Sequence, residues 1–336
     1  MQTDALFAGW AQAWAPLDVS GRLKAAPEDF VVIEKADHLT GIDEGEHLYL
    51  FLQKRNLTTR ELARALANAN NVPISSIGYS GMKDKNAVTQ QWLSIPLQQP
   101  ITQSPEQGGT AANQVVVPDD VQELARVTRA KKLRRGWHRG NCFEIVLRDL
   151  NYCEEGDAKM GCSQALDARL KQIVKNGVPN YFGVQRFGAD NLSRAIAWLP
   201  RRRRERDAFK RGLHLSVLRS YLFNTVLSAR ITDGSWNSPL AGDNCAEPVV
   251  TGPLWGRGRV QASAAVVDFE QKALDGQLSI AEELEFAGLK QERRPLQLDV
   301  QDLQWSFDEQ RSLTLKFFLP PGGYATSVLR ELGVFL

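Results

Sequence analysis

The order in which strand-like and helix-like segments follow one another most constrains what this chain can fold into. Short runs rich in β-branched and aromatic residues fill roughly the first 150 residues, and helical spacing dominates after them. Alternating apolar residues return at 313–319. A sheet that is interrupted by helices and then resumed is what an insertion into a domain produces. The sequence therefore predicts an α+β fold in which about the last forty residues rejoin the N-terminal sheet.

The first part of the chain predicts a hairpin followed by a capped helix. Phe30–Glu34 and His47–Leu52 have strand composition, and we expect them to pair as an antiparallel hairpin with a long tip. Thr58 and Glu61 have the spacing of a capping box, so a helix should begin there and run to about Asn70.

A glycine turn between two further predicted strands places one carboxylate among lysines. The strands are expected at 74–79 and 92–95, and the turn brings Asp84 between Lys83 and Lys85. Nearby cations favour the ionised form of a carboxylate, so Asp84 has the surroundings of a reactive group on a rigid support. A solvated hairpin tip is the alternative, and a Lys-Asp-Lys run without other context would favour it.

Composition excludes several classes of protein. No apolar run reaches the ~18 residues that a membrane span requires, and no secretory signal is evident at the N-terminus. The four cysteines show neither metal-type spacing nor a disulfide framework. We therefore expect a soluble cytoplasmic protein with reduced thiols, no metal, no membrane association and no obligate protein partner.

Positive charge is gathered into two blocks of a chain whose net charge is only +2. Residues 126–148 contain eight Lys or Arg and one acid, and residues 201–211 contain seven against two acids. Such blocks, with aromatic residues among them, are typical of a protein that tracks a phosphate backbone. Arg134, Arg135 and Arg139 of the first block are the predicted RNA contacts. Two solvated helix faces are the alternative.

Two further segments carry polar groups beside aromatic rings. Asn141 and Phe143 lead one face of the strand predicted after the first basic block. In residues 180–188, three aromatic residues and two glycines surround Gln185 and Arg186, which suits stacking and hydrogen bonding to a base or backbone. A tight domain joint is the alternative for the second segment, and an edge amide beside a core phenylalanine is the alternative for the first.

Five segments resemble the tRNA pseudouridine synthase D family, in that family's order and across nearly the whole chain. They are residues 27–30, 81–89, 140–143, 179–188 and 324–332. The resemblance implies a pseudouridine synthase catalytic domain with a mixed, mainly antiparallel sheet at 1–155 plus 300–336. It implies a mainly helical, family-specific insertion at 156–299, with an RNA-binding cleft between the two. The implied substrate is a uridine of tRNA, at position thirteen as in tRNA-Glu.

The resemblance also implies roles for individual residues. Asp84 falls on the family's nucleophile, and Phe30 on the aromatic residue that stacks on the target base. Lys24 falls on the lysine expected to form an ion pair with Asp84. The family's Asn-x-Phe pair falls on Asn141 and Phe143 and would position the nucleotide.

The implied reaction explains why these residue types are needed. Pseudouridine formation breaks the N1–C1′ bond, turns the uracil and rejoins it through C5, so it involves no net redox change and needs no cofactor. Asp84 suits ribose attack, a glycal route or attack on the base, all of which need an ionised carboxylate. Lys24, Lys83 and Lys85 are the candidates for keeping it ionised, and a ring such as Phe30 would hold the detached uracil.

Two other functions fit part of the pattern. A non-catalytic RNA-binding protein would use the same basic segments. A hydrolase acting on glycosides or nucleosides would want a second acid near Asp84, where the sequence offers lysines instead.

Overall fold

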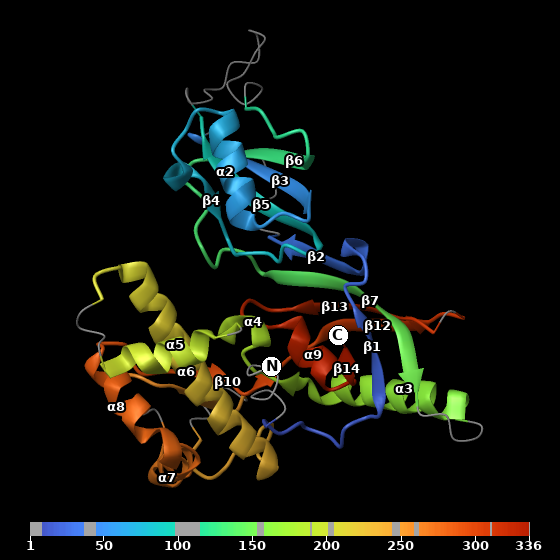
Figure 1. Cartoon of the computed structure of the whole chain (residues 1–336), viewed down its shortest axis with the longest axis vertical. Coiled ribbons are helices and arrows are strands. Elements are labelled where there is room, and N and C mark those ends of the chain that lie inside the picture. Colours follow the sequence, from blue (N-terminus) through green and yellow to red (C-terminus); the bar gives the residue numbers. More distant parts are fainter. Residues whose placement is uncertain are drawn as a thin grey trace. The chain divides into compact units, whose positions relative to one another are not determined.

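The computed structural model describes residues 9–36, 45–97, 115–152, 158–188, 190–200, 205–243, 249–258, 262–309 and 311–335. These residues form two compact units (Figure 1). The sheet unit takes its described residues from Ser20–Tyr152 and Gln301–Gly322, and the helical unit takes most of its described residues from Cys153–Val300. Residues before 20 and the segment Gly323–Val334 group with the helical unit. The domain bounds given above stay predictions, because compactness alone does not define a family-specific insertion.

A mixed β-sheet forms the sheet unit. Its main path runs β12-β13-β7-β2-β5-β3-β6, and every neighbouring pair on it is antiparallel except β2 with β5. Three further strands join it: β1 pairs with β7, β14 (Val334–Phe335) pairs with β1, and β4 pairs with β5. The strands are β1 (Val19–Leu23), β2 (Phe30–Lys35), β3 (His47–Arg55), β4 (Gly78–Tyr79), β5 (Val88–Pro96), β6 (Gln122–Arg129), β7 (Gly140–Tyr152), β12 (Gln301–Phe307) and β13 (Leu313–Leu319). The predicted α+β class with a mainly antiparallel sheet is confirmed.

The predicted hairpin of residues 30–34 with 47–52 is wrong. Both segments are strands, but β5 lies between them, since Val32 pairs in parallel with Thr89 and Leu50 pairs antiparallel with Leu93. The chain reaches β5 through a helix, and such a crossover can place a later strand between two earlier ones. Composition identifies a strand without identifying its neighbour.

Helix α2 (Thr59–Ala69) has the predicted cap and covers one face of β3 and β5 (Figure 1). The hydroxyl of Thr58 accepts from the backbone N–H of Glu61 at 3.1 Å, and the Glu61 carboxylate accepts from the N–H of Thr58 at 2.7 Å. Leu62 and Leu66 are fully buried and belong to one core cluster with residues of β3 and β5. Burying each such leucine is worth about 1.5–3 kcal/mol, so α2 is held mainly by its apolar face.

The strand predicted at 74–79 is only partly present. A 3-10 turn, η3 (Ile74–Ser76), occupies its first half, because both the N–H and the hydroxyl of Ser76 bond to the carbonyl of Pro73. Only Gly78–Tyr79 pairs with β5. A second 3-10 turn, η1 (Pro27–Asp29), precedes β2.

The helical unit is built around one long buried helix, α6. Six of its apolar side chains are fully buried, from Val217 to Leu227, so the helix contacts neighbours on several sides. The elements are α3 (Ala158–Asn176), β8 (Val178–Pro179), α4 (Val184–Phe187), α5 (Asn191–Trp198), α6 (Ala208–Thr232), β9 (Thr251–Leu254), α7 (Ala264–Ala273), η6 (Asp275–Gln277), α8 (Leu278–Phe286), β10 (Glu292–Pro295), β11 (Gln297–Leu298) and α9 (Ala325–Arg330), with β14 (Val334–Phe335) after them. Within the described ranges, no helix has both the length and the apolar composition to cross a bilayer.

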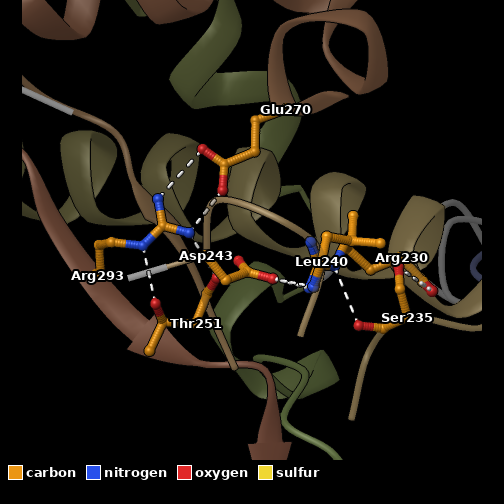
Figure 2. Close-up of polar contacts among 7 residues, drawn as sticks. All are labelled: Arg230, Ser235, Leu240, Asp243, Thr251, Glu270 and Arg293. Atoms are coloured by element: carbon orange, nitrogen blue, oxygen red, sulfur yellow. Dashed lines mark hydrogen bonds and ion pairs between the residues drawn. The ribbon is translucent and has the colours of Figure 1, made fainter. Parts of the chain in front are cut away.

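Two buried ion pairs fasten the outer elements of the helical unit (Figure 2). Arg230 of α6 lies 2.7 Å from Asp243, and Arg293 of β10 lies 2.6 Å from Glu270 of α7. Arg293 also donates to the hydroxyl of Thr251 in β9 at 2.8 Å. Burial raises the pKa of Glu270, and the hydrogen bond from Arg293 opposes that shift.

Candidate active site

Several of the predicted site residues lie on one face of the sheet. Glu34 in β2 pairs with Asn141 in β7, and Val32 pairs with both Phe143 in β7 and Thr89 in β5. Residues paired across a ladder project to the same side, so these five side chains share a face. Helix α2 packs against the part of this face that β3 and β5 form. Asp84 lies in the turn between β4 and β5, beside this group.

Two lysines from separate segments hold Asp84. Its Oδ2 lies 3.0 Å from the Nζ of Lys24, and its backbone carbonyl accepts a hydrogen bond from the Nζ of Lys54 at 2.8 Å. The side chain of Asp84 is 41% exposed and that of Lys24 is 27% exposed. The carboxylate is therefore fixed in position while it stays open to a ligand.

Lys24 adopts a backbone conformation that is uncommon for its residue type. Its φ is +58°, in the left-handed region, where a residue with a Cβ carries a strain of roughly 1–3 kcal/mol. The following turn is tied down by Asp29, whose buried carboxylate accepts from the N–H of Ala26 and from the guanidinium of Arg148 at 2.6 Å. Arg148 lowers the pKa of Asp29, which keeps this tie ionised. Nearby structure thus supports the strained lysine.

Lys83 points away from the carboxylate next to it in the sequence. Its Nζ lies 2.7 Å from Oε2 of Glu34 and 2.7 Å from Oδ1 of Asn141. The Lys83 side chain is 5% exposed and that of Glu34 is fully buried, and the N–H of Trp92 donates to the other oxygen of Glu34 at 3.3 Å. Lys83 therefore anchors the turn to β2 and β7. The backbone N–H of Lys83 also donates to the hydroxyl of Thr59 at 2.8 Å.

Phe30 forms one end of a wall of three aromatic rings. Its ring meets that of Phe143 edge-on at 6.2 Å between centroids, and Phe143 stacks on Phe317 of β13 at 5.4 Å. The Nζ of Lys24 lies 4.2 Å from the centroid of the Phe30 ring, and Phe30 is only 4% exposed. A base can stack fully on that face of Phe30 only after the ammonium group moves aside.

The remaining predicted contacts divide between the two units. Arg134, Arg135 and Arg139 are exposed in the segment between β6 and β7 of the sheet unit. Gln185 and Arg186 belong to α4 of the helical unit, where Gln185 is exposed and the Arg186 guanidinium lies 5.4 Å from the ring centroid of Phe182. The arginines at 201–204 of the second basic block lie outside the described residues.

Sequence reasoning missed Lys54, Glu34 and His138. Lys54 is fully buried in β3, donates to the carbonyls of Leu57 and Asp84, and has its pKa lowered by burial to about 8. Burial also lowers the pKa of His138, and the charge of Lys83 lowers it further. An isolated charged residue in a strand pattern usually faces solvent, so the sequence carried no signal for these positions.

Comparison with known proteins identifies the family of this chain. A family model described as tRNA pseudouridine synthase D matches residues 13–200 and 244–332, and the first range includes Lys24, Phe30 and Asp84. The tRNA pseudouridine synthase D of Pseudomonas putida (strain GB-1) is 39% identical over 337 residues, covering 92% of this chain and 90% of the relative. That of Cellvibrio japonicus (strain Ueda107) is 40% identical over 326 residues, covering 96% and 91%.

A solved structure shares the fold. It is a crystal structure titled as a putative tRNA pseudouridine synthase D from Methanosarcina mazei, which superposes with a TM-score of 0.68 at 21% identity and covers 96% of this chain and 95% of its own. Because the family model spans most of the chain and relatives near 40% identity align over at least 90% of both sequences, this protein belongs to the tRNA pseudouridine synthase D family.

Proposed function

We propose that this protein isomerises uridine to pseudouridine in tRNA and that Asp84 is the group that acts on the nucleotide. The observation that carries the proposal is the carboxylate of Asp84, which is 41% exposed and held at 3.0 Å by Lys24, while the polar residues behind it are buried. Membership of the tRNA pseudouridine synthase D family supports the reaction and the substrate.

The reaction requires a nucleophile and no redox partner. The N1–C1′ bond breaks, its electron pair leaves with the uracil, and a C5–C1′ bond forms after the ring has turned. A proton is lost from C5 and one is gained at N1, so atoms and charge balance without a redox partner. Asp84 acts as the nucleophile, which requires an ionised carboxylate at a fixed position, and Lys24 supplies the positive charge beside it.

Lys54 and Lys83 act by positioning. Lys54 fixes the backbone carbonyl of Asp84, and Lys83 ties the turn to Glu34 and Asn141. Asn141 therefore supports the turn through Lys83. This arrangement keeps the reactive carboxylate within the narrow range of positions that catalysis needs.

Phe30 is the ring proposed to contact the uracil. Stacking on a ring is typically worth ~1–3 kcal/mol per base, enough to retain a detached uracil while it turns. Since the Lys24 ammonium covers one face of Phe30, binding of the base there is coupled to a shift of Lys24. Phe143 supports the ring from its edge. The exposed residues Arg134, Arg135 and Arg139, together with Gln185 and Arg186, are proposed to contact the RNA.

Replacing the carboxylate tests the proposal. Asp84→Asn should lower the rate of pseudouridine formation in a tRNA transcript by at least roughly 1,000-fold, because a nucleophile cannot be replaced by an amide of similar size. Binding to the same tRNA should stay within about 3-fold. Asp120→Asn, at an exposed aspartate in the turn before β6, is the matched control and should change neither.

Mapping of the product tests the target. Pseudouridine is expected at position thirteen of tRNA-Glu. Turnover retained in Asp84→Asn would remove Asp84 from the chemistry, and a product at another position would remove the proposed target. Tight RNA binding without any pseudouridine would favour the non-catalytic alternative.

A further inference from the structure

A cavity of about 600 Å³ in the sheet unit has no assigned ligand, although two residues of its lining, Arg134 and Arg135, are among the proposed RNA contacts. It lies between the first turn of α2, the segment from η3 to β4, and the segment that joins β6 to β7. Its volume falls in the range of small-ligand sites, which is about 300–1,000 Å³. The same unit contains Asp84, so the cavity and the carboxylate belong to one folded body.

The lining combines an aromatic ring, buried apolar residues and a set of basic residues, called here the basic rim. Tyr79 contributes the ring, and Ala63, Ile77 and Leu133 are the buried apolar residues. The basic lining residues are Arg60, Lys132, Arg134 and Arg135. None of the described residues that line the cavity is acidic. This combination matches a nucleotide, whose base has an apolar face for a ring and whose phosphate attracts guanidinium and ammonium groups.

The backbone that carries the basic rim is fixed in advance. The carbonyl of Lys131 accepts from the hydroxyl of the fully buried Tyr49 at 2.7 Å, and the N–H of Leu133 donates to the hydroxyl of Ser94 at 2.9 Å. The N–H of Gly136 donates to the carbonyl of Ser80 at 2.8 Å. Two hydrogen bonds to the sheet and one to the residue after β4 therefore hold this segment while Arg134 stays exposed. Binding of a ligand therefore costs little conformational entropy in this backbone segment.

Gly78 allows the same segment to approach closely. A Cβ at this position would lie 2.4 Å from the Ser94 hydroxyl oxygen and 2.5 Å from the carbonyl oxygen of Leu133. A glycine is thus required where β4 meets the segment that carries the basic rim. The Arg135 guanidinium lies over the Tyr79 ring, 5.9 Å from its centroid, so a base that stacks on this face of the ring also contacts Arg135.

The cavity is close to Asp84 along the chain. Asp84 is five positions after Tyr79, and a fully extended chain of that length spans at most about 18 Å between the two Cα atoms. Stacked nucleotides advance by ~3.4 Å each along a strand. A stacked strand that runs directly between the two places therefore spans about five nucleotides or fewer.

We propose that this cavity binds a second nucleotide of the RNA, within about five positions of the target uridine. The base stacks on Tyr79, and its phosphate contacts Arg134, Arg135 and Lys132. The site explains how the enzyme can hold the RNA strand beside a uridine that has left its own stack. The proposal rests on the proposed function only in taking RNA as the ligand.

Abasic scanning of the RNA tests the proposal. The tRNA is assembled from two oligonucleotides so that an abasic nucleotide can replace each of the five positions on either side of the target, and its affinity is measured with Asp84→Asn protein to prevent turnover. One position should lower the affinity by roughly 5-fold or more, as expected for a lost base stack. In a Tyr79→Leu background the same substitution should have little effect, because the ring that read that base is gone. Tyr79→Phe keeps the ring and should behave like Tyr79.

Salt dependence tests the basic rim. The slope of log affinity against log salt should decrease by about 1 for each phosphate contact removed, so Arg134→Ala and Arg135→Ala should each reduce it. Lys316→Ala removes an exposed charge from β13, on the opposite face of the sheet from Phe317, and should leave the slope unchanged. Circular dichroism of each variant confirms that it is folded.

The outcomes separate the two proposals. If pseudouridine forms but every abasic substitution weakens RNA binding as much with Tyr79→Leu as with Tyr79, the cavity does not bind a base and the inference is overturned. If the abasic coupling is found while no pseudouridine forms in any tRNA, the cavity stands and the proposed function fails.

Discussion

The ammonium of Lys24 contacts a carboxylate and an aromatic ring at once. It lies 3.0 Å from Oδ2 of Asp84 and 4.2 Å from the centroid of the Phe30 ring. Any movement of Lys24 therefore changes the surroundings of both groups. Because Lys24 has a φ of +58° and adjoins a turn fixed by Asp29 and Arg148, its backbone has little freedom to relax. The side chain is the part that can move when a base arrives.

Removing this ammonium should slow the chemistry more than it weakens binding. Lys24→Met keeps a long side chain but deletes the charge beside Asp84, and we expect a loss of at least roughly 10-fold in single-turnover rate, equivalent to about 1.4 kcal/mol of barrier. Affinity for tRNA should fall by less than about 3-fold. Rapid-quench assays with saturating protein measure the rate. An equal loss in rate and affinity would mean that Lys24 only binds RNA.

The two possible roles of Phe30 can be told apart with an RNA that lacks the target base. Phe30→Leu should lower the rate more than the affinity. If Phe30 stacks on the uracil, the remaining affinity loss should vanish with an RNA that is abasic at the target. If it only positions Lys24, the loss should be the same with both RNAs. Phe317→Leu, at the other end of the ring wall, is the matched control and should leave the rate within a few-fold.

At the scale of elements, local signals predicted helix α2 and several strands, but they did not predict which strands pair. The cap at Thr58 and Glu61 predicted α2, and the alternation at 313–319 predicted β13 together with its return to the sheet. The neighbours of β2 depend on the crossover through α2, which no local pattern encodes. Glu34 was missed for the same reason, because Lys83 becomes its neighbour only when β5 pairs with β2.

The buried pair of Glu34 and Lys83 fastens the turn of Asp84 to β2. Glu34→Leu alone leaves the Lys83 ammonium buried without its carboxylate and should lower the free energy of unfolding by about 3–5 kcal/mol. The double change Glu34→Leu with Lys83→Met removes both charges and should recover most of that loss. Urea unfolding of the three proteins provides the comparison. A double variant as unstable as the single one would contradict this account.

Buried Lys54 should give the stability of the protein a distinct pH dependence. Its pKa is about 8 in the folded protein against 10.5 ordinarily, because burial disfavours the ammonium. Below pH 8 both folded and unfolded states hold the proton, and the cost of burial is present in full. Between pH 8 and 10.5 the unfolded state binds more protons, so stability rises with pH.

The size of this dependence follows from the shift. At about 1.36 kcal/mol per pKa unit, the free energy of unfolding should rise by up to about 3 kcal/mol across that window relative to Lys54→Met, which has no such proton to lose. Urea titrations of both proteins at pH 7.5, 8.5, 9.5 and 10.5 measure the difference. Parallel curves would show that Lys54 keeps an ordinary pKa.

At the scale of the whole molecule, the two units have separate means of stabilisation. The helical unit relies on a core around α6 and on the ion pairs of Arg230 and Arg293 (Figure 2). Arg293→Met leaves Glu270 buried without its partner, and we expect amide hydrogens of β9, β10 and α7 to exchange faster with solvent. Those of β2 and β7 should keep their protection, because their hydrogen bonds belong to the sheet unit.

Hydrogen exchange with mass spectrometry resolves these segments. Lys171→Met, which removes an exposed i,i+4 pair with Asp167 on α3, is the control and should have little effect. Faster exchange throughout both units would mean that the molecule unfolds as one cooperative body.

The interrupted sheet has a consequence for how this protein is made. A ribosome completes β7 at Tyr152, but the strand that pairs along its free edge, β13, ends only at Leu319. Because synthesis proceeds at about 5–20 residues per second, that edge stays unpaired for roughly 10–30 s. During this interval an open row of N–H and C=O groups, with Phe143 and Ile145 among its residues, is available to any other nascent strand. The speed of translation through the helical unit therefore decides how long each new molecule is exposed to aggregation.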